Sequence, residues 1–504
     1  MASNAVGSEL IAKTVGYQLT SGNFSNTTPN LPQKVVIIGQ KNTGGTLDDE
    51  EFEFTDAYSV GVKFGFGSPL HQAARILRPI NGPGIGGIPT SILAQEDPIS
   101  SVAQAWDITV SGVATTSHFL DIKINGRSSV DGVSYAVSVE VGDTDTIIAG
   151  KINDAINNAN AVCPLTSTFA TDTVSAVCKW KGESGKDTNI TITPSNLSTT
   201  VSYVVSSAAT GSGVPTVTSS LNKIGSKWAT IILNTYQFNA TNSVVKELEA
   251  WNGVPSANTP TGRYASTTMK PAIAVTGFVT DNESNVTDTM LDNVTIALAP
   301  APLSKGMPCE AAANMVRLLA RQAQDNPHLD VSVQSYPDMP TPSDIGTMSV
   351  YDNRNLYMTK GCSTVTLEGG KYKIENFITT YHPLGESNPE FRAVRNLVKD
   401  FNVKYGYALL ENQYVMDHAI AGDDAIVEAS KVIKPKIWKS ILYSYAEDLE
   451  KRAIITDTEF MQDSIVVNLS ATNPDRLETF FRYKKTGYAV ISSTTVESGS
   501  NFGE

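Results

Sequence analysis

The sequence predicts an α+β protein of several domains, with a mixed-sheet core, an inserted β-rich α+β module and extended N- and C-terminal arms. Three observations support this fold class. The chain has 504 residues, more than one hydrophobic core usually organises. Residues 106–220 alternate apolar and polar side chains, whereas the chain on either side mixes unbroken apolar runs with helical periods. Residues 1–30 hold no helical period, and the chain ends in a loose Ser/Gly tail.

The composition argues against several classes of protein. The 51 acidic and 38 basic residues give a net charge of -13, so the chain repels phosphate, and we expect neither nucleic acid nor anionic lipid as its main partner. The first ten residues lack the basic and apolar regions of a signal peptide, and no run of about 18 apolar residues predicts membrane insertion. The four cysteines form no CxxC pair, which favours reduced thiols in a cytoplasm over disulfides.

The changes of pattern divide the chain into consecutive segments. They are an N-terminal arm (1–30), the first part of a core domain (31–105), an inserted outer module (106–220), the second part of the core domain (221–350), a C-terminal domain (351–485) and a C-terminal arm (486–504). The middle segment is placed as an insertion because polar or Gly/Pro-rich chain flanks it on both sides.

Apolar runs and helical periods predict the elements of the core domain. Residues 34–39 form an unbroken apolar run, as expected of a strand buried on both faces. A helix is expected after Ser68-Pro69. Further strands are expected at 228–233, 273–279 and 294–299, and further helices from Ser243 and over 309–324. This order of strands and helices favours a mixed sheet with helices packed against it.

The inserted module shows the clearest strand pattern. Alternation around residues 106–111, 120–125 and 135–141 predicts strands with one face in water, and Asn125-Gly126 predicts a turn. Asp145 and Thr146 are expected to cap a helix that carries Ile148, Ile152 and Ile156. Strands at 174–180 and 189–193 are expected to complete a compact α+β module.

The last third of the chain predicts alternating strands and helices. Strands are expected at 371–380 and 464–469, helices from Asn388-Pro389 and from Pro435, and a strand-like run at 486–496.

Motifs that would carry catalysis are weak in this sequence. The loop Gly82-Pro83-Gly84-Ile85-Gly86-Gly87 lacks the Lys-Ser/Thr ending of a phosphate-binding loop, and Pro83 removes a backbone donor, so a plain loop is favoured. The acidic run at 48–51 lacks the ligand spacing of a calcium loop and is expected to be solvated. The five histidines are scattered, and the adjacent Asp417-His418 are expected to point apart. We therefore expect no catalytic residue, metal ion or cofactor, although a carboxylate pair for glycoside chemistry leaves no fixed spacing and stays open.

The C-terminal third resembles the tail sheath family of contractile phages, in its Mu-type branch. The resemblance is carried by Thr364-Val365-Thr366-Leu367-Glu368-Gly369-Gly370-Lys371-Tyr372-Lys373-Ile374-Glu375 and then by Phe377-Ile378-Thr379-Thr380-Tyr381. Asn376 stands where the family leads us to expect a basic residue. The runs Leu120-Asp121-Ile122-Lys123-Ile124-Asn125-Gly126, residues 137–144 and residues 152–157 follow in the order seen in that branch.

The resemblance implies a structural subunit and not an enzyme. It implies homo-oligomeric, helical stacking of rings around an inner tail tube, contact with baseplate and tail terminator proteins, and contraction that drives the tube through the host envelope. The expected location is the virion tail, and the host cytoplasm during assembly. Residues 351–485 would be the assembly domain.

The resemblance also implies that both arms reach neighbouring subunits. The predicted inter-subunit strand contains Tyr488, Ala489, Val490, Ile491 and Val496, which alternate as an added strand requires, and Val15, Tyr17 and Leu19 are the expected contacts of the N-terminal arm. Two alternatives stay open: a strand at 486–496 within its own domain, and an inert N-terminal leader.

The rival functions are an envelope-polysaccharide hydrolase, with the module as a sugar-binding domain, or another virion surface protein. Trp106, Tyr135 and Trp180 lie on the apolar sides of strands, where core packing explains them.

Overall fold

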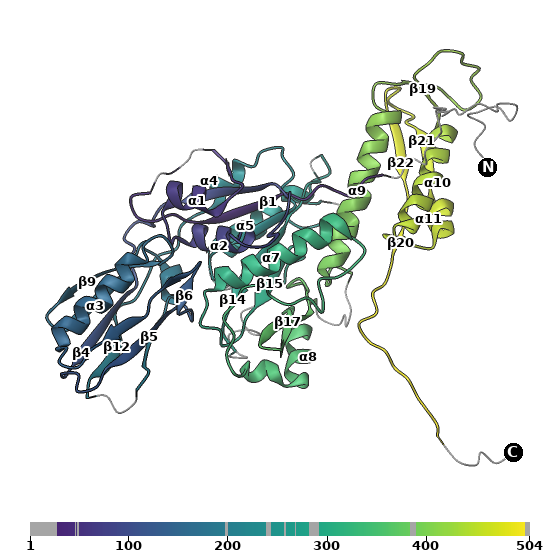
Figure 1. Ribbon diagram of the computed structural model, residues 1–504. Helices are drawn as coiled ribbons and strands as arrows, with labels where there is room; N and C mark the ends of the chain where they lie inside the picture. Colours follow the sequence, from purple (N-terminus) through teal and green to yellow (C-terminus); the bar gives the residue numbers. More distant parts are fainter. Residues whose placement is uncertain are drawn as a thin grey trace, which may run out of the picture. The chain divides into compact units, whose positions relative to one another are not determined.

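The computed structural model describes residues 28–45, 47, 50–196, 200–237, 243–256, 259–267, 269–281, 292–383 and 390–498. The chain forms two compact units. The larger unit contains Leu31–Val403 and the chain from Lys485 onward, and the smaller unit contains Lys404–Lys484 together with the chain up to Asn30. Figure 1 shows the order of the elements along the chain. Among the described residues, no helix combines the length and the apolar character needed to cross a bilayer.

The central sheet of the larger unit has six strands in the order β15-β14-β13-β1-β3-β2. They are β1 (Val35–Gln40), β2 (Phe52–Glu53), β3 (Thr90–Gln95), β13 (Ile231–Asn234), β14 (Ile273–Phe278) and β15 (Ile296–Pro300). All neighbouring pairs are parallel except β2, which runs antiparallel to β3 at the edge. The expected mixed sheet is therefore confirmed, and several smaller sheets accompany it.

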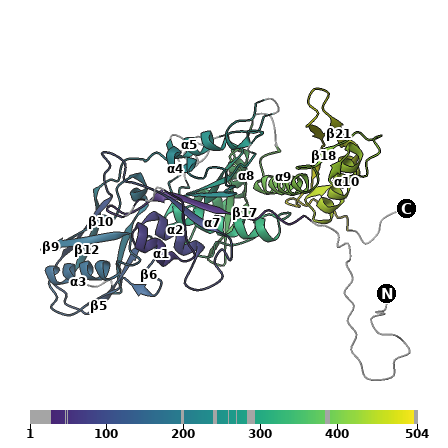
Figure 2. The same cartoon turned by 90° about the horizontal axis from the view of Figure 1, so that it is seen from above.

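Helices cover both faces of this sheet, which explains why β1, β3, β13, β14 and β15 are buried along their whole length. Figure 2 shows α4 and α5 on one side and α1, α2 and α7 on the other. The helices are α1 (Ala57–Phe64), α2 (Pro69–Leu77), α4 (Thr218–Asn222), α5 (Ser243–Asn252) and α7 (Pro308–Asp325). Val36, Ile38 and Ile232 pack in one apolar cluster with residues of α4 and α5.

The N-terminus of α7 is set close against β14. Pro308 occupies the first turn, where its missing N–H leaves no bond unmade, and the Glu310 carboxylate accepts the Met307 N–H at 2.8 Å. A Cβ on Gly277 of β14 would lie 1.8 Å from the Pro308 carbonyl oxygen. Only glycine allows the helix to approach the strand this closely.

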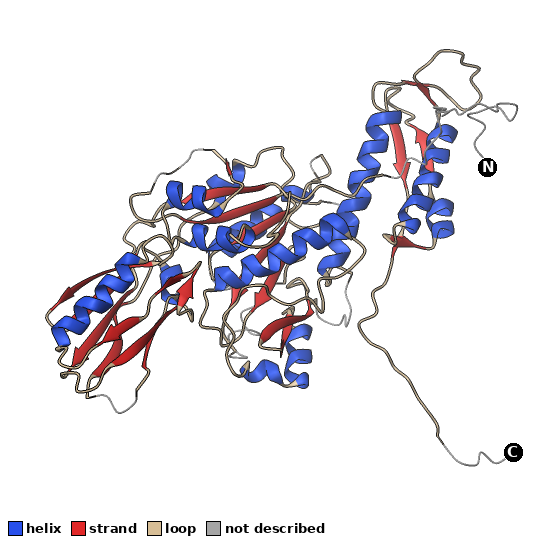
Figure 3. Cartoon of the chain, viewed as in Figure 1, coloured by secondary structure: helices blue, strands red, loops and turns tan. Residues whose placement is uncertain are grey.

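The module between β3 and α4 consists of two sheets and a helix, seen at the lower left of Figure 3. Its four-stranded sheet has the order β12-β4-β10-β9, and its three-stranded sheet has the order β11-β5-β8. The elements are β4 (Ala105–Ser111), β5 (His118–Ile124), β6 (Ser129–Val130), β7 (Val133–Ser134), β8 (Val137–Val139), α3 (Asp145–Asn158), β9 (Leu165–Ala170), β10 (Thr173–Cys178), β11 (Ile190–Pro194) and β12 (Ser202–Ala209).

Two local expectations for the module can be compared with its geometry. Asn125 and Gly126 have φ values of 50° and 72°, so the expected turn is present. The cap of α3 is Thr144, one residue before the expected pair, because its hydroxyl accepts the N–H of Ile147. Asp145 instead accepts the N–H of Thr146 at 2.6 Å.

Residues 351–403 belong to the larger unit, so the smaller unit begins later than the expected domain start at 351. This region contains α8 (Tyr351–Thr359), the hairpin β16 (Thr364–Glu368) and β17 (Lys371–Asn376), and the first part of α9 (Val394–Tyr414). The expected strand at 371–380 ends at Asn376, and Thr379 instead forms an isolated bridge with Ala297. The helix expected from Asn388-Pro389 begins at Val394, and the residues of that dipeptide lie outside the described ones.

The smaller unit packs short strands and helices around the end of α9. Its elements are β18 (Ala419–Ile420), β19 (Val432–Ile433), α10 (Pro435–Lys451), β20 (Ile455–Thr456), α11 (Thr458–Ser464), β21 (Val466–Leu469) and β22 (Leu477–Phe480), before β23 (Lys484–Lys485) at the return to the larger unit. Trp438 of α10 is buried, and its indole N–H donates to the Thr479 hydroxyl at 3.1 Å.

Candidate functional site

The described part of the C-terminal arm, residues 486–498, contains neither helix nor strand. Ile491 is 87% exposed, Val496 79% and Val490 46%, and Ala489 is also exposed. Figure 1 shows this segment as an extended trace in yellow. Apolar side chains in an extended segment without a ladder partner among the described residues are the features that strand addition requires.

The start of this arm, from Lys485 to Tyr488, contacts the first part of α9 and is called its root. The ammonium of Lys399 donates to the Thr486 carbonyl oxygen at 2.5 Å, and the ammonium of Lys485 lies 2.7 Å from a carboxylate oxygen of Asp400. The guanidinium of Arg395 lies over the Tyr488 ring, 5.2 Å from its centre. Burial, with the nearby cations, lowers the pKa of Lys399 to about 8.

The expected N-terminal contacts Val15, Tyr17 and Leu19 lie outside the described residues. The described chain begins at Thr28, whose N–H and hydroxyl both donate to Asp448 of α10, at 3.1 and 2.7 Å. The first residue of the larger unit, Leu31, donates its N–H to the Asn402 side-chain oxygen at 2.9 Å.

The family-like motif lies in two places. Gly369 and Gly370 form the turn between β16 and β17, with φ values of 57° and 69°. Thr379 and Thr380 are buried beside β15, where the Thr380 N–H donates to the Ile296 carbonyl at 2.8 Å. Tyr381 packs its ring against Phe391. The motif therefore fixes the chain after the hairpin to the edge of the central sheet, while its glycines only turn the hairpin.

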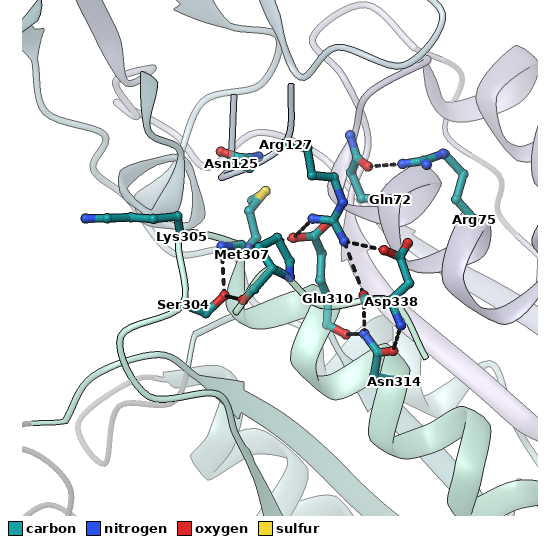
Figure 4. A network of polar contacts seen from close by, with 12 residues as sticks. Gln72, Arg75, Asn125, Arg127, Ser304, Lys305, Met307, Glu310, Asn314 and Asp338 are labelled. Carbon is teal, nitrogen blue, oxygen red and sulfur yellow. Dashed lines mark hydrogen bonds and ion pairs between the residues drawn. The ribbon is translucent and has the colours of Figure 1, made fainter. Parts of the chain in front are cut away.

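A buried polar network joins the module to the core, as Figure 4 shows. Arg127, after the Asn125-Gly126 turn, lies 2.9 Å from the Glu310 carboxylate and 3.0 Å from that of Asp338. Although burial alone would lower it, these two carboxylates hold the pKa of Arg127 above its usual value. Asn314 donates to the Asp338 carbonyl at 2.7 Å. These contacts fix the position of the module relative to the N-terminus of α7.

Sequence reasoning missed this network because its partners are far apart along the chain. Arg127 and Glu310 are separated by 183 positions, and charge alone does not pair them. Two weak signals were present in the sequence. Arg127 directly follows the Asn125-Gly126 turn, and Glu310 is the third residue of a helix that begins at a proline, where a carboxylate commonly caps the helix.

The module also fills the carboxyl edge of the sheet beside β1, where the strand order reverses. Doubly wound sheets usually bind their ligands at this point. Here Gln40 donates to the Lys181 carbonyl at 2.6 Å and accepts from the Ser184 hydroxyl at 2.9 Å. The Thr43 hydroxyl donates to Asp97 at 2.5 Å.

Of the weak catalytic candidates from the sequence, His71 and the start of the Gly-rich loop line one groove. Gly82, Pro83 and Gly84 line this groove of about 610 Å³, and Arg78 donates to the Gly86 carbonyl of the loop and, at 2.6 Å, to the Ile88 carbonyl that follows it. His71 is buried and accepts the Gly67 N–H at 3.1 Å, and burial lowers its pKa to about 3. Across the described ranges, no group of His, Cys, Asp and Glu is placed to hold a metal ion. All four cysteines are free thiols and buried.

Comparison with known proteins gives a relative along nearly the whole chain. No protein-family model matches. The chain is 22% identical over 478 residues to the Mu-like prophage FluMu tail sheath protein of Haemophilus influenzae, which covers 91% of this chain and 92% of the relative. The crystal structure of a sheath tail protein from Desulfitobacterium hafniense covers 93% of this chain and 100% of its own, with 11% identity and a TM-score of 0.44. The resemblance noted in the sequence is confirmed by the Haemophilus relative, a Mu-like tail sheath protein to which this chain is similar along nearly its whole length.

Proposed function

We propose that this chain is the structural subunit of a contractile tail sheath. Subunits polymerise as stacked rings around an inner tail tube, and the polymer contracts to drive the tube through the host envelope. The observation that carries this proposal beyond the family relationship is the C-terminal arm, which leaves Val490, Ile491 and Val496 exposed in an extended segment. Such a segment is suited to complete a sheet in a neighbouring copy.

The energetics favour donation of the arm only within an assembly. About five ladder hydrogen bonds at about 1 kcal/mol each contribute about 5 kcal/mol. Ordering roughly ten residues costs about 1–2 kcal/mol for each residue, which exceeds that gain. Burial of the exposed Val490, Ile491 and Val496 adds about 1.5–3 kcal/mol for each side chain. Several such contacts in each subunit make the polymer stable while a single arm stays unpaired.

The same proposal assigns the remaining partners and the location. The N-terminal arm, through Val15, Tyr17 and Leu19, contacts a second neighbouring subunit, and residues 351–485 provide the assembly surface. The inner tube, the baseplate and the tail terminator protein are the other partners. The module at 106–220 faces outward. The subunit is not an enzyme, since contraction draws on free energy stored during assembly, and it acts in the virion tail after assembly in the host cytoplasm.

The competing hydrolase proposal loses its support in the module. A sugar-binding groove needs several exposed aromatic rings, but Trp180 and Tyr135 are buried, Trp106 packs against the core of the module, and the exposed Phe119 and Phe169 lie on different sheets. Trp180, Tyr135 and Trp106 fill the space between the sheets and α3. No second function is proposed.

Truncation after Lys485 tests the proposed function. The cut removes the exposed arm and almost none of the buried core, so the shortened protein should melt close to the temperature of the full-length monomer. It should fail to form striated cylinders in electron micrographs. The matched control ends after Glu497, which keeps Tyr488 to Val496 and should assemble normally. Normal cylinders from the shorter protein would reject the arm, and an unfolded product would favour an internal strand at 486–496.

A further inference from the structure

One turn of α9, from Lys399 to Asn402, contacts the roots of both terminal segments within the larger unit. Lys399 and Asp400 hold the C-terminal root through Thr486 and Lys485. Asn402, on the same turn, holds Leu31 at the other root. We propose that this turn is a clamp that fixes the exit points of both arms before they reach a neighbouring subunit. The inference rests on the arm donation proposed above and names the residues that position the arms.

The C-terminal side of the clamp is made of charged groups at fixed positions. Lys399 is fully buried, so its ammonium cannot exchange the Thr486 carbonyl for water. The Lys485 ammonium pairs with Asp400 at 2.7 Å and with Glu390. The Tyr488 ring then lies under the Arg395 guanidinium, which is a favourable cation–π arrangement. The chain is therefore held at three successive points before it becomes exposed.

On the N-terminal side, this turn of α9 holds the chain through the Asn402 amide. The Asn402 side-chain NH₂ donates to the Val398 carbonyl at 2.8 Å, which leaves its oxygen turned toward the Leu31 N–H at 2.9 Å. Leu31 is 3% exposed, so this backbone group has no water to bond instead. The helix thus fixes the orientation of the amide, and the amide fixes the start of the larger unit.

A purely structural role explains Lys399 poorly. A methionine would fill the same space with a stem of similar length and no charge to remove from water. The lysine gives up solvation to reach one carbonyl at the point where the arm begins. The hydrogen bond instead fixes the Thr486 carbonyl in place. Because the start of the arm is already ordered, its ordering adds no entropy cost when the arm is donated. Only the arm beyond Tyr488 then has to become ordered in the neighbouring subunit.

The charges around Lys399 make the clamp sensitive to pH. Arg395 and Lys485 disfavour the ammonium, whereas Asp330 and Asp400 favour it; His328, whose pKa burial and Lys399 lower from 6.5, is neutral near pH 8. Burial is the largest effect, and the pKa falls to about 8 from 10.5. A released root would expose Lys399 to water and return its pKa toward the ordinary value. The docked root therefore binds fewer protons, and docking should strengthen as the pH rises through 8.

Cleavage of the full-length monomer after Tyr488 by chymotrypsin measures release of the root directly. Lys399→Met should be cut about tenfold faster than the unchanged protein at pH 7.5, because the Thr486 carbonyl loses its donor. It should also lose the slowing of cleavage between about pH 7 and 9. Lys399→Arg keeps a donor and should restore most of the protection without that pH dependence. The control Lys246→Met, on the exposed side of α5, should behave as the unchanged protein.

Two further variants keep the test decisive if Lys399→Met does not fold. Asp400→Asn weakens the Lys485 pair and should also accelerate cleavage, while Asn402→Ala should leave the C-terminal root protected and loosen Leu31. Unchanged cleavage in both Lys399→Met and Asp400→Asn would overturn the clamp. The truncation after Lys485 reports on arm donation separately. Cylinders lost on truncation, with unchanged cleavage in the clamp variants, would reject the clamp and keep the proposed function.

Discussion

Arg127 and Glu310 join the inserted module to the N-terminus of α7, with the guanidinium nitrogen Nη1 2.9 Å from the carboxylate oxygen Oε1. The same carboxylate accepts the Met307 N–H at 2.8 Å, so one side chain both caps the helix and binds the module. Both side chains are largely removed from water, at 12% and 4% exposure. A pair in this setting is costly to break from one side, because the remaining charge stays buried.

Removal of either partner should therefore destabilise the larger unit. Arg127→Met leaves the Glu310 carboxylate buried without its cation and should lower the free energy of unfolding by about 3–5 kcal/mol. The double variant Arg127→Met/Glu310→Gln should recover most of that loss. Chemical denaturation of the unchanged protein, the two single variants Arg127→Met and Glu310→Gln, and the double variant gives the coupling. The exposed Lys123 and Asp121 pair on β5 is the control, and Lys123→Met should change stability by less than about 1 kcal/mol. Equal losses in both arginine variants would contradict the pairing.

His71 should make the larger unit sensitive to acid. Its folded-state pKa of about 3 lies below the ordinary 6.5, because the ring is buried beside Arg75 and Lys179. Between these values the unfolded chain binds a proton that the folded chain does not. Stability is therefore complete above 6.5 and falls as the pH is lowered toward 3, by up to about 1.4 kcal/mol per pH unit.

His71→Asn tests this slope, since the amide oxygen can accept the Gly67 N–H without titrating. Denaturant midpoints measured between about pH 7 and 4 should decline less steeply in this variant. His418, which is half-buried on the smaller unit, provides the control, and His418→Asn should keep the full slope. A steep slope that survives in His71→Asn would assign the acid sensitivity to other groups.

Replacement of residues 106–213 by a Gly/Ser linker, which stops short of the expected boundary at 220 because Val217 and α4 belong to the core, should leave a subunit that still builds cylinders, only thinner ones. Removal of the module would also expose Met307 and Cys309 to water, because these two residues pack in the apolar cluster of the module. Glu310 would also lose Arg127. The replacement should therefore be made with Glu310→Gln and Met307→Gln, beside the plain linker version. Electron microscopy and sedimentation compare them. Insoluble or monomeric protein from both would show that the module is required for the core to fold.

Assembly should need no nucleotide. The edge of the sheet where a doubly wound fold binds phosphate groups is filled by Gln40, Lys181 and Ser184. Light scattering with purified protein should give the same rate and extent of polymerisation with EDTA as with ATP or GTP at fixed magnesium. Acceleration by either nucleotide, absent with a non-binding analogue, would refute this expectation.

Some elements could be predicted from sequence because their signals are local. The module strands expose one face to water, so they show alternation, and α7 and α10 begin at prolines that mark a first turn. α8 was missed because Tyr357 is its only fully buried side chain. The boundary between the units was also beyond local reasoning. It falls inside the continuous helix α9, whose period does not change where the chain passes from Val403 to Lys404.

The candidate site divides in the same way. The arm could be anticipated, since alternation at 488–491 precedes a polar tail, but its clamp could not. Lys399 and Thr486 are 87 positions apart, and a lysine in a helix ordinarily predicts an exposed face. The junction at Arg127 depends likewise on a contact between distant segments. Side chains that act across long sequence distances leave no periodic signal.

The division of the chain between two units also sets an order of events during synthesis. Leu31–Val403 is continuous and can fold as it leaves the ribosome, whereas the smaller unit must wait for Lys404–Lys484 before Thr28 finds Asp448. Residues 486–498 emerge only after both units are complete. A nascent subunit therefore has no C-terminal arm to donate while its own sheets are unfinished, so polysomes making many copies side by side are protected from premature linkage through that arm.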